Sequence, residues 1–484
     1  MLLEKILEER RKKLELLQRE HCDPYPVSTK RSMHIGAFVT SFSSLIKKPT
    51  SLYLVGRVRS IRDQGKILFV SCEDMSGRVQ FVLKKDTVLS FDLIKKTLEV
   101  GDIIQGGGIP IKTKTGEKSL LLKKFTLLTK SLQPLPTDFY GLEDIELRLR
   151  KRYIDTILNP LERDLFVKKS IFWKTMREFL EASDFMSVET PVFEVTPGGA
   201  EAEPFVTHHN ALDEDFYLRI SLEIALKKMI VGGFEKIYEI GRIFRNEGID
   251  AEHLQDYTQL EFYWAYADYR DLMKFVKKMY QTVIKKTFGT LILPYNGTKI
   301  NWGGAWEIVD YCKIFQKHNK LDILSCSDDA LRARAKELEI RFEKNVGRGR
   351  LIDLIYKKTV RPLLIHPSFL INPPVTIEPL AKRSPQDPRV VERFQVMAYG
   401  TELGKGFSEL NDPIDQRERF EEQMKLREKG DVEAQILDED FLEALEYGMP
   451  PTAGFGTSER LFSVLAQRPI RETIFSPPMK RRKK

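Results

Sequence analysis

A polar stretch with apolar flanks, KIYEIGRIFRNEGIDAEHLQDYTQLEFYWAYADY, occupies residues 236–269. Its pattern predicts two strands joined by a polar loop. Because side chains two residues apart on a strand share a face, we expect Arg245 to lie beside Glu247. With His253 and Tyr257 in the connecting loop, this pair can hold a phosphate, an exocyclic amine and an aromatic base plane. A structural ion pair is the alternative interpretation.

Acidic and aromatic residues share strand faces both here and in a later stretch, GTELGKGFSELNDPIDQRERF. Glu261 shares its face with Tyr263, and Phe407 shares its face with Glu409. Two buried carboxylates next to a tyrosine would form a pocket that demands a cation, because unpaired charges in an apolar site are costly.

Glycines mark places where the backbone could approach a ligand closely. They flank Lys405, which follows Glu402, and in GMPPTAGFGTSERLFSVLAQ they lead into Arg460 at a predicted helix start. The phosphate-binding patterns GxGxxG and GxxxxGK[ST] do not occur where a strand would feed a helix. Any nucleotide site must therefore be of another kind.

The elements that position these residues belong to one large unit of helices and strands, from about residue 138 onward. Residues 161–183 carry an apolar stripe at helical spacing, and the extended segment FMSVETPVFE follows. A proline-containing stretch, SLQPLPTDFYG, is the predicted linker before this unit.

Residues 51–132 have a different pattern, in which short β-branched and aromatic runs alternate with glycine turns. Five strands in this length predict a small Greek-key barrel of the OB type, whose exposed face can stack unpaired bases on aromatic rings. Phe69 and Gln80 are candidates for that face, with Arg57 and Arg62 on or beside the first strand. A place in the core is the alternative for Phe69.

The first 20 residues have the spacing of a charged helix that ends before Asp23. We expect this helix to pack against the protein's own body. The alternative is phosphate contact through its basic residues, Arg10, Arg11, Lys12 and Lys13.

Composition places the 484-residue chain among soluble globular proteins, since 42% of its residues are hydrophobic and 31% are charged, with a net charge of +8. Wholesale disorder and fibrous classes are excluded. The four cysteines form no CxxC pair, so we expect reduced thiols and no zinc site. No segment has the character of a signal peptide or membrane span, so we expect a cytoplasmic protein without membrane association.

Along nearly its whole length the chain resembles the class II lysyl-tRNA synthetases. Motif 1 corresponds to residues about 161–191, motif 2 to 236–269, and motif 3, GFGTSERL, lies within 448–468. Two further stretches are similar to segments particular to the lysine enzymes, namely TPGGAEAEPFVTHHNALDEDFYLRIS and GKGFSELNDPIDQ. The resemblance implies an α+β fold, with a helical arm at 1–45, an OB-fold anticodon-binding domain at 46–133, and at 134–484 a catalytic antiparallel sheet with flanking helices.

The family's reaction is implied with the fold. Lysine and ATP give lysyl-adenylate and pyrophosphate, and the lysyl group then passes to the 3′ end of tRNA. On matching positions, Arg245 and Arg460 are the implied catalytic residues. The implied ATP-binding residues are Arg245, Glu247, His253, Tyr257, Glu402 and Arg460; the implied lysine-binding residues are Gly199, Glu223, Glu261, Tyr263, Phe407 and Glu409; the implied anticodon contacts are Arg57, Phe69, Gln80 and Glu117.

Several positions depart from the family's pattern close to the chemistry. Gln395 stands where the family has a metal-binding carboxylate, Lys405 replaces an asparagine, Glu252 replaces a basic residue, and motif 3 is one residue short. We expect Mg²⁺ with Glu402 as its main protein ligand, and Glu409 and Gln395 as further candidates. We also expect Lys405 either to replace part of the metal's charge, to approach Glu409, or to turn toward phosphate or solvent.

Two other functions are compatible with these residues. One is a lysine-activating paralogue that modifies a protein, although the barrel domain argues against it. The other is a tRNA-binding regulator with a decayed active site, which the retained Arg245, Glu247 and Arg460 argue against. The apolar helix at 161–183 further predicts a homodimer through the motif 1 region.

Overall fold

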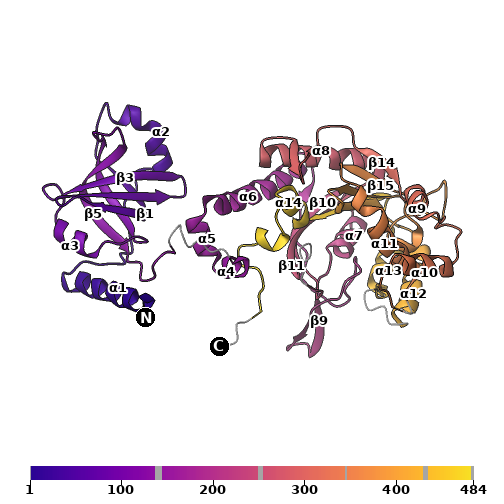
Figure 1. Cartoon of the computed structure of the whole chain (residues 1–484). Helices are drawn as coiled ribbons and strands as arrows, with labels where there is room; N and C mark the ends of the chain where they lie inside the picture. Colours follow the sequence, from indigo (N-terminus) through magenta and orange to yellow (C-terminus); the bar gives the residue numbers. More distant parts are fainter. Residues whose placement is uncertain (1, 137–143, 249–253, 344–345, 429–433, 481–484) are drawn as a thin grey trace. The chain divides into compact units, whose positions relative to one another are not determined.

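The computed structural model describes residues 2–136, 144–248, 254–343, 346–428 and 434–480 (Figure 1). Contacts divide the chain into two compact units, residues 1–145 and 146–484. Among the described residues, no helix has the length and apolar character needed to cross a membrane.

The first unit is built around a closed barrel of five strands in the order β1-β2-β3-β5-β4. Side chains alternate between the barrel interior and its surface, so Leu68, Val70 and Cys72 are buried while Phe69 is not. The predicted barrel is confirmed. Its elements are β1 (Leu52–Asp63), β2 (Ile67–Asp74), β3 (Gly77–Lys84), β4 (Ile103–Lys112) and β5 (Lys118–Thr129), with α1 (Leu2–Arg19), α2 (Ile35–Leu45) and α3 (Phe91–Thr97).

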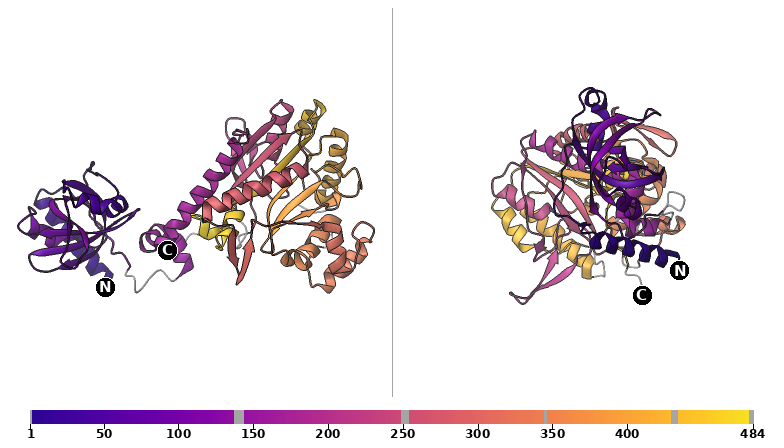
Figure 2. Two further views of the ribbon diagram at one scale, coloured as in Figure 1. Left: turned by 90° about the horizontal axis from the view of Figure 1, so that it is seen from above. Right: turned by 90° about the vertical axis from the view of Figure 1, so that its left-hand side faces the viewer.

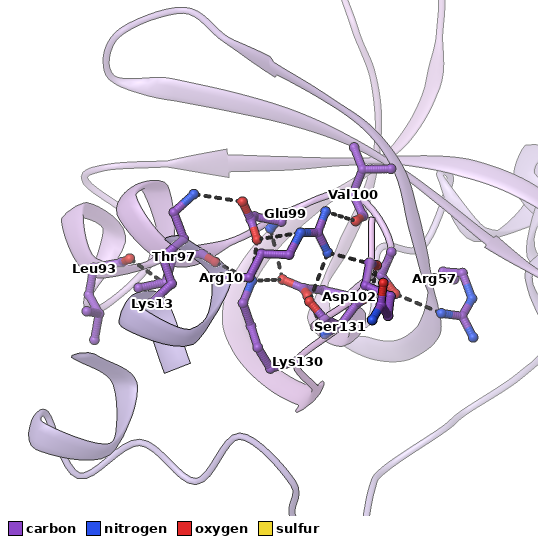
Figure 3. Close-up of polar contacts among 12 residues, drawn as sticks. Arg10, Lys13, Arg57, Leu93, Thr97, Glu99, Val100, Asp102, Lys130 and Ser131 are labelled. Carbon is purple, nitrogen blue, oxygen red and sulfur yellow. Dashed lines mark hydrogen bonds and ion pairs between the residues drawn. The ribbon is translucent and has the colours of Figure 1, made fainter. Parts of the chain in front are cut away.

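Helix α1 packs on the barrel unit through a buried ion-pair network (Figure 3). Arg10 Nε lies 3.2 Å from Glu99 Oε2, and Lys13 Nζ lies 2.8 Å from Glu99 Oε1. The buried Lys130 ammonium pairs with Asp102 Oδ2 at 2.9 Å. These pairs support the interpretation of α1 as a packed helix, because two basic side chains of its 10–13 run, Arg10 and Lys13, are engaged by Glu99.

The second unit is centred on an eight-stranded sheet in the order β14-β15-β16-β17-β18-β11-β10-β6. All neighbours are antiparallel except the two outermost pairs, β14–β15 and β10–β6. The predicted fold class is therefore confirmed. The strands are β6 (Met186–Ser187), β10 (Lys236–Phe244), β11 (Asp256–Ala265), β14 (Glu307–Asp310), β15 (Ser368–Ile371), β16 (Arg393–Ala398), β17 (Thr401–Ser408) and β18 (Thr452–Ser458).

Two long helices, α6 (Pro160–Glu181) and α8 (Tyr269–Phe288), run side by side (Figure 2). Their apolar stripes pack on sheet residues that include Phe262, Phe394 and Phe455. Proline at the first position of α6 and the Asn159 side chain, which accepts from the Leu161 N–H, fix where that helix begins.

A second apolar cluster joins α7 (Glu223–Val231), α12 (Pro413–Glu428) and α13 (Glu439–Glu446) to Ile243, Tyr263 and Phe407 of the sheet. Because neighbouring residues of β11 alternate between the two clusters, Glu261 and Tyr263 point to the side opposite Phe262. Tyr257, Tyr263 and Phe407, three of the predicted site residues, pack in this second cluster.

Residues 310–358, whose role the sequence leaves open, form a helical layer with its own core around Phe315, Leu331 and Ile352. Its helices are α9 (Tyr311–Asn319), α10 (Asp328–Glu337) and α11 (Arg348–Thr359). The remaining elements are α4 (Ile145–Arg150), α5 (Arg152–Leu158), α14 (Glu459–Leu465), η2 (Arg361–Leu363), η3 (Val375–Ile377), η4 (Ile470–Thr473), the hairpin β12 (Ile292–Tyr295) and β13 (Thr298–Asn301), and a small sheet of β7 (Phe193–Glu194), β9 (Glu214–Leu218) and β8 (Val206–His209).

Two predictions about the strands at 236–269 are wrong in detail. Strand β10 ends at Phe244, so Arg245 and Glu247 lie beyond it rather than on one strand face. Tyr257, which was expected in the loop, is the second residue of β11 and pairs with Ile243. His253 lies outside the described residues.

Candidate active site

Glu261 lies in the middle of β11, and its buried carboxylate is held by donors from two elements. Oε1 accepts from the Ser221 hydroxyl at 2.8 Å and from the Leu222 N–H at 3.1 Å. Oε2 accepts from the Tyr263 hydroxyl at 3.0 Å. The expected pairing of Glu261 with Tyr263 on one face is therefore present, and the carboxylate is fixed before any ligand arrives.

Glu409 lies directly after β17 and is also buried. Its partner is Lys227 of α7, whose Nζ lies 2.5 Å from Glu409 Oε2 and 2.5 Å from Glu223 Oε1. Lys227 was missed in the sequence, although Glu223 and Lys227 are spaced i,i+4 on one helix face and Lys227 is flanked by apolar residues of that face.

Burial and charge crowding shift the pKa values of this cluster. Burial raises the pKa of Glu409 well above its usual range, and it raises that of Glu223 as well. Burial would lower the pKa of Lys227, but Glu223 and Glu409 outweigh it and raise that pKa. Glu223 and Glu409 thus share the Lys227 ammonium, Glu261 raises the Glu223 pKa further, and Glu409 Oε1 is buried without a hydrogen-bond partner. A buried carboxylate oxygen without a partner is costly unless a donor or a cation meets it.

Two glycines leave room for the acidic cluster. Gly199 has φ +80°, and a Cβ there would lie 2.8 Å from Glu223 Cβ. A Cβ at Gly454 would overlap Glu409 Oε1 and the Tyr263 ring. Both glycines are therefore needed for close approach, and Gly199 also for its left-handed backbone.

A second group of predicted residues gathers around the Tyr257 ring. The Arg245 guanidinium carbon lies 5.8 Å from the ring centroid, and its Nε donates to the Ile220 carbonyl at 3.2 Å. Burial raises the Tyr257 pKa, which Arg245 and Arg460 oppose and Glu247 reinforces. Arg460 Nε is buried without a hydrogen-bond partner. An aromatic plane with flanking guanidinium groups is suited to a nucleotide.

Gln395 lies on β16, and Glu402 lies on the neighbouring strand β17. The Gln395 amide donates to Glu402 Oε2, while Gln395 Oε1 is buried without a partner. Among the described residues, no group of three or more His, Cys, Asp or Glu side chains could hold a metal. A carboxylate and an amide oxygen still fit one Mg²⁺ that arrives with phosphates, because such an ion takes one or two protein carboxylates and keeps water or phosphate for the rest.

Lys405 pairs with a residue that sequence reasoning missed. Its Nζ lies 2.9 Å from Oε2 of the buried Glu378, to which Arg393 also donates at 3.2 Å. The expectation that Lys405 satisfies Glu409 is wrong, since Lys227 is the cation beside Glu409. Glu378 is distant in sequence from Lys405 and follows no periodic pattern, so no local signal indicated the pair.

In the first unit, the predicted anticodon residues lie on or next to the strands of the barrel. Phe69 points outward, with the Arg62 guanidinium 4.7 Å from its ring centroid. Gln80 donates to the Ser119 hydroxyl at 3.0 Å, and Arg57 donates to the Gly101 carbonyl at 2.8 Å. Glu117 is exposed in the turn between β4 and β5. The core alternative for Phe69 does not hold.

Comparison with known proteins agrees with this fold and site. Residues 144–480 match the model of tRNA synthetases class II (D, K and N), and residues 52–128 match the OB-fold nucleic acid binding domain. Three relatives are each named lysine–tRNA ligase. They come from Carboxydothermus hydrogenoformans (42% identical, covering 99% of this chain and 99% of the relative), Halalkalibacterium halodurans (42%; 99% and 97%) and Thermotoga maritima (41%; 100% and 97%).

The matched domains define a class II aminoacyl-tRNA synthetase with an OB-fold anticodon-binding domain. At this identity over its whole length, the chain belongs to the lysine–tRNA ligase family of these enzymes. The predicted family is thereby confirmed, and so is the predicted enzyme class, an ATP-dependent ligase that charges tRNA with lysine. Nothing in these matches favours a protein-modifying paralogue or a decayed regulator.

Proposed function

We propose that this chain activates lysine with ATP and transfers the lysyl group to the 3′ end of its tRNA, using the residues of the candidate active site. The observation that carries the assignment is the buried acidic cluster, in which Glu223 and Glu409 share the Lys227 ammonium and Glu261 is buried as well. A substrate with a side-chain ammonium supplies the missing charge, whereas a neutral or acidic amino acid leaves it uncompensated.

Glu261, Tyr263 and Glu409 bind the ε-ammonium of lysine in this proposal. The support is that Glu409 Oε1 has no partner and that Glu261 is already oriented by Ser221 and Tyr263. Gly199, Glu223 and Phe407 shape the site around the amino acid in this proposal, and the close approach of Gly199 to Glu223 supports it.

Adenylate formation needs stabilisation of charge on the α-phosphate rather than a protein nucleophile. A carboxylate oxygen of lysine forms the bond to the α-phosphorus, and pyrophosphate leaves with the electron pair of the broken P–O bond. We assign Arg245 to the α-phosphate, where its guanidinium neutralises the developing charge. We assign Glu247 to the adenine amine, Tyr257 and Arg460 to the two faces of the ring, and His253 to the terminal phosphate.

Transfer to tRNA completes the reaction. A hydroxyl of the terminal ribose attacks the carbonyl carbon of lysyl-adenylate, an ester forms, and AMP leaves with the electron pair of the broken bond. Glu402, with Gln395, would hold Mg²⁺, which supplies charge neutralisation to the polyphosphate when bound. In the barrel, Phe69 would stack an unpaired anticodon base, while Arg57, Gln80 and Glu117 would contact neighbouring groups.

We further propose a homodimer formed through the motif 1 region. Helix α6 carries apolar side chains on its exposed side, including Leu161, Val167 and Ile171. Such side chains are suited to a two-fold interface. Because charging occurs where translation takes place, we assign the protein to the cytoplasm. We also propose the domain bounds 1–45 for the helical arm, 46–133 for the anticodon-binding domain and 134–484 for the catalytic domain.

Charging of tRNA with labelled lysine tests the proposed function. The purified chain should form acid-stable, base-labile lysyl-tRNA and release one AMP per lysine transferred. The Arg245→Ala variant should lower the turnover number about 10²–10³-fold, because one donor to developing charge is lost. Charging that continues unchanged in this variant would contradict the assigned role of Arg245.

A further inference from the structure

The Lys227 ammonium is a fixed cation within the amino-acid pocket. Its side chain is fully buried, and Nζ lies 2.5 Å from one carboxylate oxygen of Glu223 and 2.5 Å from one of Glu409. The rings of Phe407 and Phe441 lie 5.4 and 5.9 Å from this nitrogen. Aromatic rings and carboxylates together hold the ammonium in one place.

This placement leaves a defined set of oxygens for a ligand. Lys227 engages Glu223 Oε1 and Glu409 Oε2, and Glu409 Oε1 stays buried without a hydrogen-bond partner. Without the Lys227 ammonium, two buried carboxylates would repel each other and their orientation would no longer be fixed.

We propose that Lys227 is a specificity-determining positioning residue, which orients Glu409 so that its free oxygen Oε1 meets a single substrate ammonium. Its charge offsets one of the carboxylates of this cluster, so that Glu223 and Glu409 do not both confront the substrate as unpaired anions. The proposal rests on the proposed function and adds to it the residue that sets the pocket's charge. The other charged and titratable groups around this cluster are Glu261, Tyr263, Glu378 and Lys405.

Replacement of Lys227 by methionine tests the proposal, because methionine has nearly the same length and can pack against Phe407 and Phe441. In ATP–pyrophosphate exchange, K227M should raise the KM for lysine at least about tenfold and leave the KM for ATP within about twofold. Its preference for lysine over the neutral analogue 6-hydroxynorleucine should fall by a similar factor, since Glu409 Oε1 is no longer oriented.

The matched control is K228M, which removes a charge from the next position of the same helix. Neither Glu223 nor Glu409 pairs with Lys228, so K228M should retain the wild-type KM for lysine and the wild-type preference. A K227M enzyme that loses thermal stability but keeps both values would show a merely structural ion pair and would overturn the proposal.

A crystal structure of the wild-type protein with lysine tests the same inference even if K227M does not fold. Lys227 should keep both carboxylate contacts, with the substrate ammonium within hydrogen-bond distance of Glu409 Oε1. Displacement of Lys227 from Glu409 by the substrate would overturn the proposal. Absence of any lysine-dependent exchange in the wild-type protein would instead count against the proposed function itself.

Discussion

Glu261 and Glu409 are both buried carboxylates, yet they are prepared for substrate in different ways. Glu261 is surrounded by hydrogen-bond donors, whereas Glu409 has an ammonium on one oxygen and nothing on the other. The first can therefore hold its orientation without a ligand, and the second is completed only by one. In the proposed function, this difference underlies recognition of a side-chain ammonium.

Replacing Tyr263 by phenylalanine should weaken lysine binding without affecting the nucleotide. The change removes the hydroxyl that donates to Glu261 Oε2 and leaves a buried carboxylate oxygen unsatisfied, at a cost of about 1–3 kcal/mol. We expect the KM for lysine in pyrophosphate exchange to rise about 5- to 150-fold. An equal rise in the KM for ATP would contradict a role confined to the amino-acid pocket.

Glu194 gives a pH-dependent prediction for stability. Burial raises its pKa from 4.5 to about 8, with Arg219 acting in the opposite direction. Between these values the folded state binds a proton that the unfolded state has released, so the free energy of unfolding falls as the pH rises.

The Glu194→Gln variant should remove this pH-dependent fall in the free energy of unfolding, because glutamine does not ionise. Denaturant unfolding at about pH 5 and about pH 9 should show the variant gaining stability over the wild type only at the higher pH. A difference between the two proteins that does not change with pH would contradict the raised pKa.

Much of the acidic pocket was predictable at the scale of residues, because a strand's period of two places Glu261 with Tyr263. Lys227 and Glu378 were not predictable in the same way. A lysine is rarely buried unless it is paired, and its second partner, Glu409, is far away in sequence. Only the folded chain brings them together.

At the scale of elements, the barrel and the two long strands β10 and β11 follow from β-branched runs and from the polar loop between them. The end of β10 could not be predicted in this way, because Arg245 continues the alternating pattern although the strand ends at Phe244. Tertiary contacts, such as the Arg245 N–H bond to the Gln255 carbonyl, set where this loop begins.

Helix α1 should depend on Arg10 for its attachment to the barrel unit. The Arg10 guanidinium pairs with Glu99 and donates to the carbonyls of Ser131 and Val100 (Figure 3). Removing the guanidinium leaves these carbonyls without their donor at a cost of about 1–3 kcal/mol, while Glu99 keeps Lys13 and Lys130. R10M should therefore speed hydrogen exchange of amides 2–19 while lysine activation without tRNA continues.

The exposed neighbour Arg11 provides the control. R11M changes a surface position of the same helix, so we expect a stability change within about 0.5 kcal/mol. Equal exchange rates in R10M and the wild type would mean that the buried network does not hold α1.

At the scale of the whole molecule, the two units have separate tasks in the proposed reaction. Length and patterning predicted two units, with the barrel preceding the larger unit along the chain. The family resemblance supplied the order of motifs in the larger unit. The helical layer at 310–358 was not predictable as to its role, because its helices build a local core around Phe315 and contain none of the site residues.

Separate tasks predict separate effects of a change in the barrel. Phe69→Ala removes an outward aromatic ring, and base stacking is worth about 1–3 kcal/mol, so the KM for tRNA in charging should rise about 5- to 150-fold. Pyrophosphate exchange without tRNA should be unchanged. A loss of exchange in this variant would contradict the division of tasks.

The most direct test of the central claim is amino-acid-dependent ATP–pyrophosphate exchange by the wild-type protein before any tRNA is added. Lysine, arginine, ornithine and aspartate should be compared across a magnesium titration. The acidic cluster around Glu261 and Glu409 predicts strong exchange with lysine and little with aspartate, and membership of the lysine–tRNA ligase family predicts little with arginine and ornithine. No exchange with lysine, or a preference for another amino acid, would contradict the account.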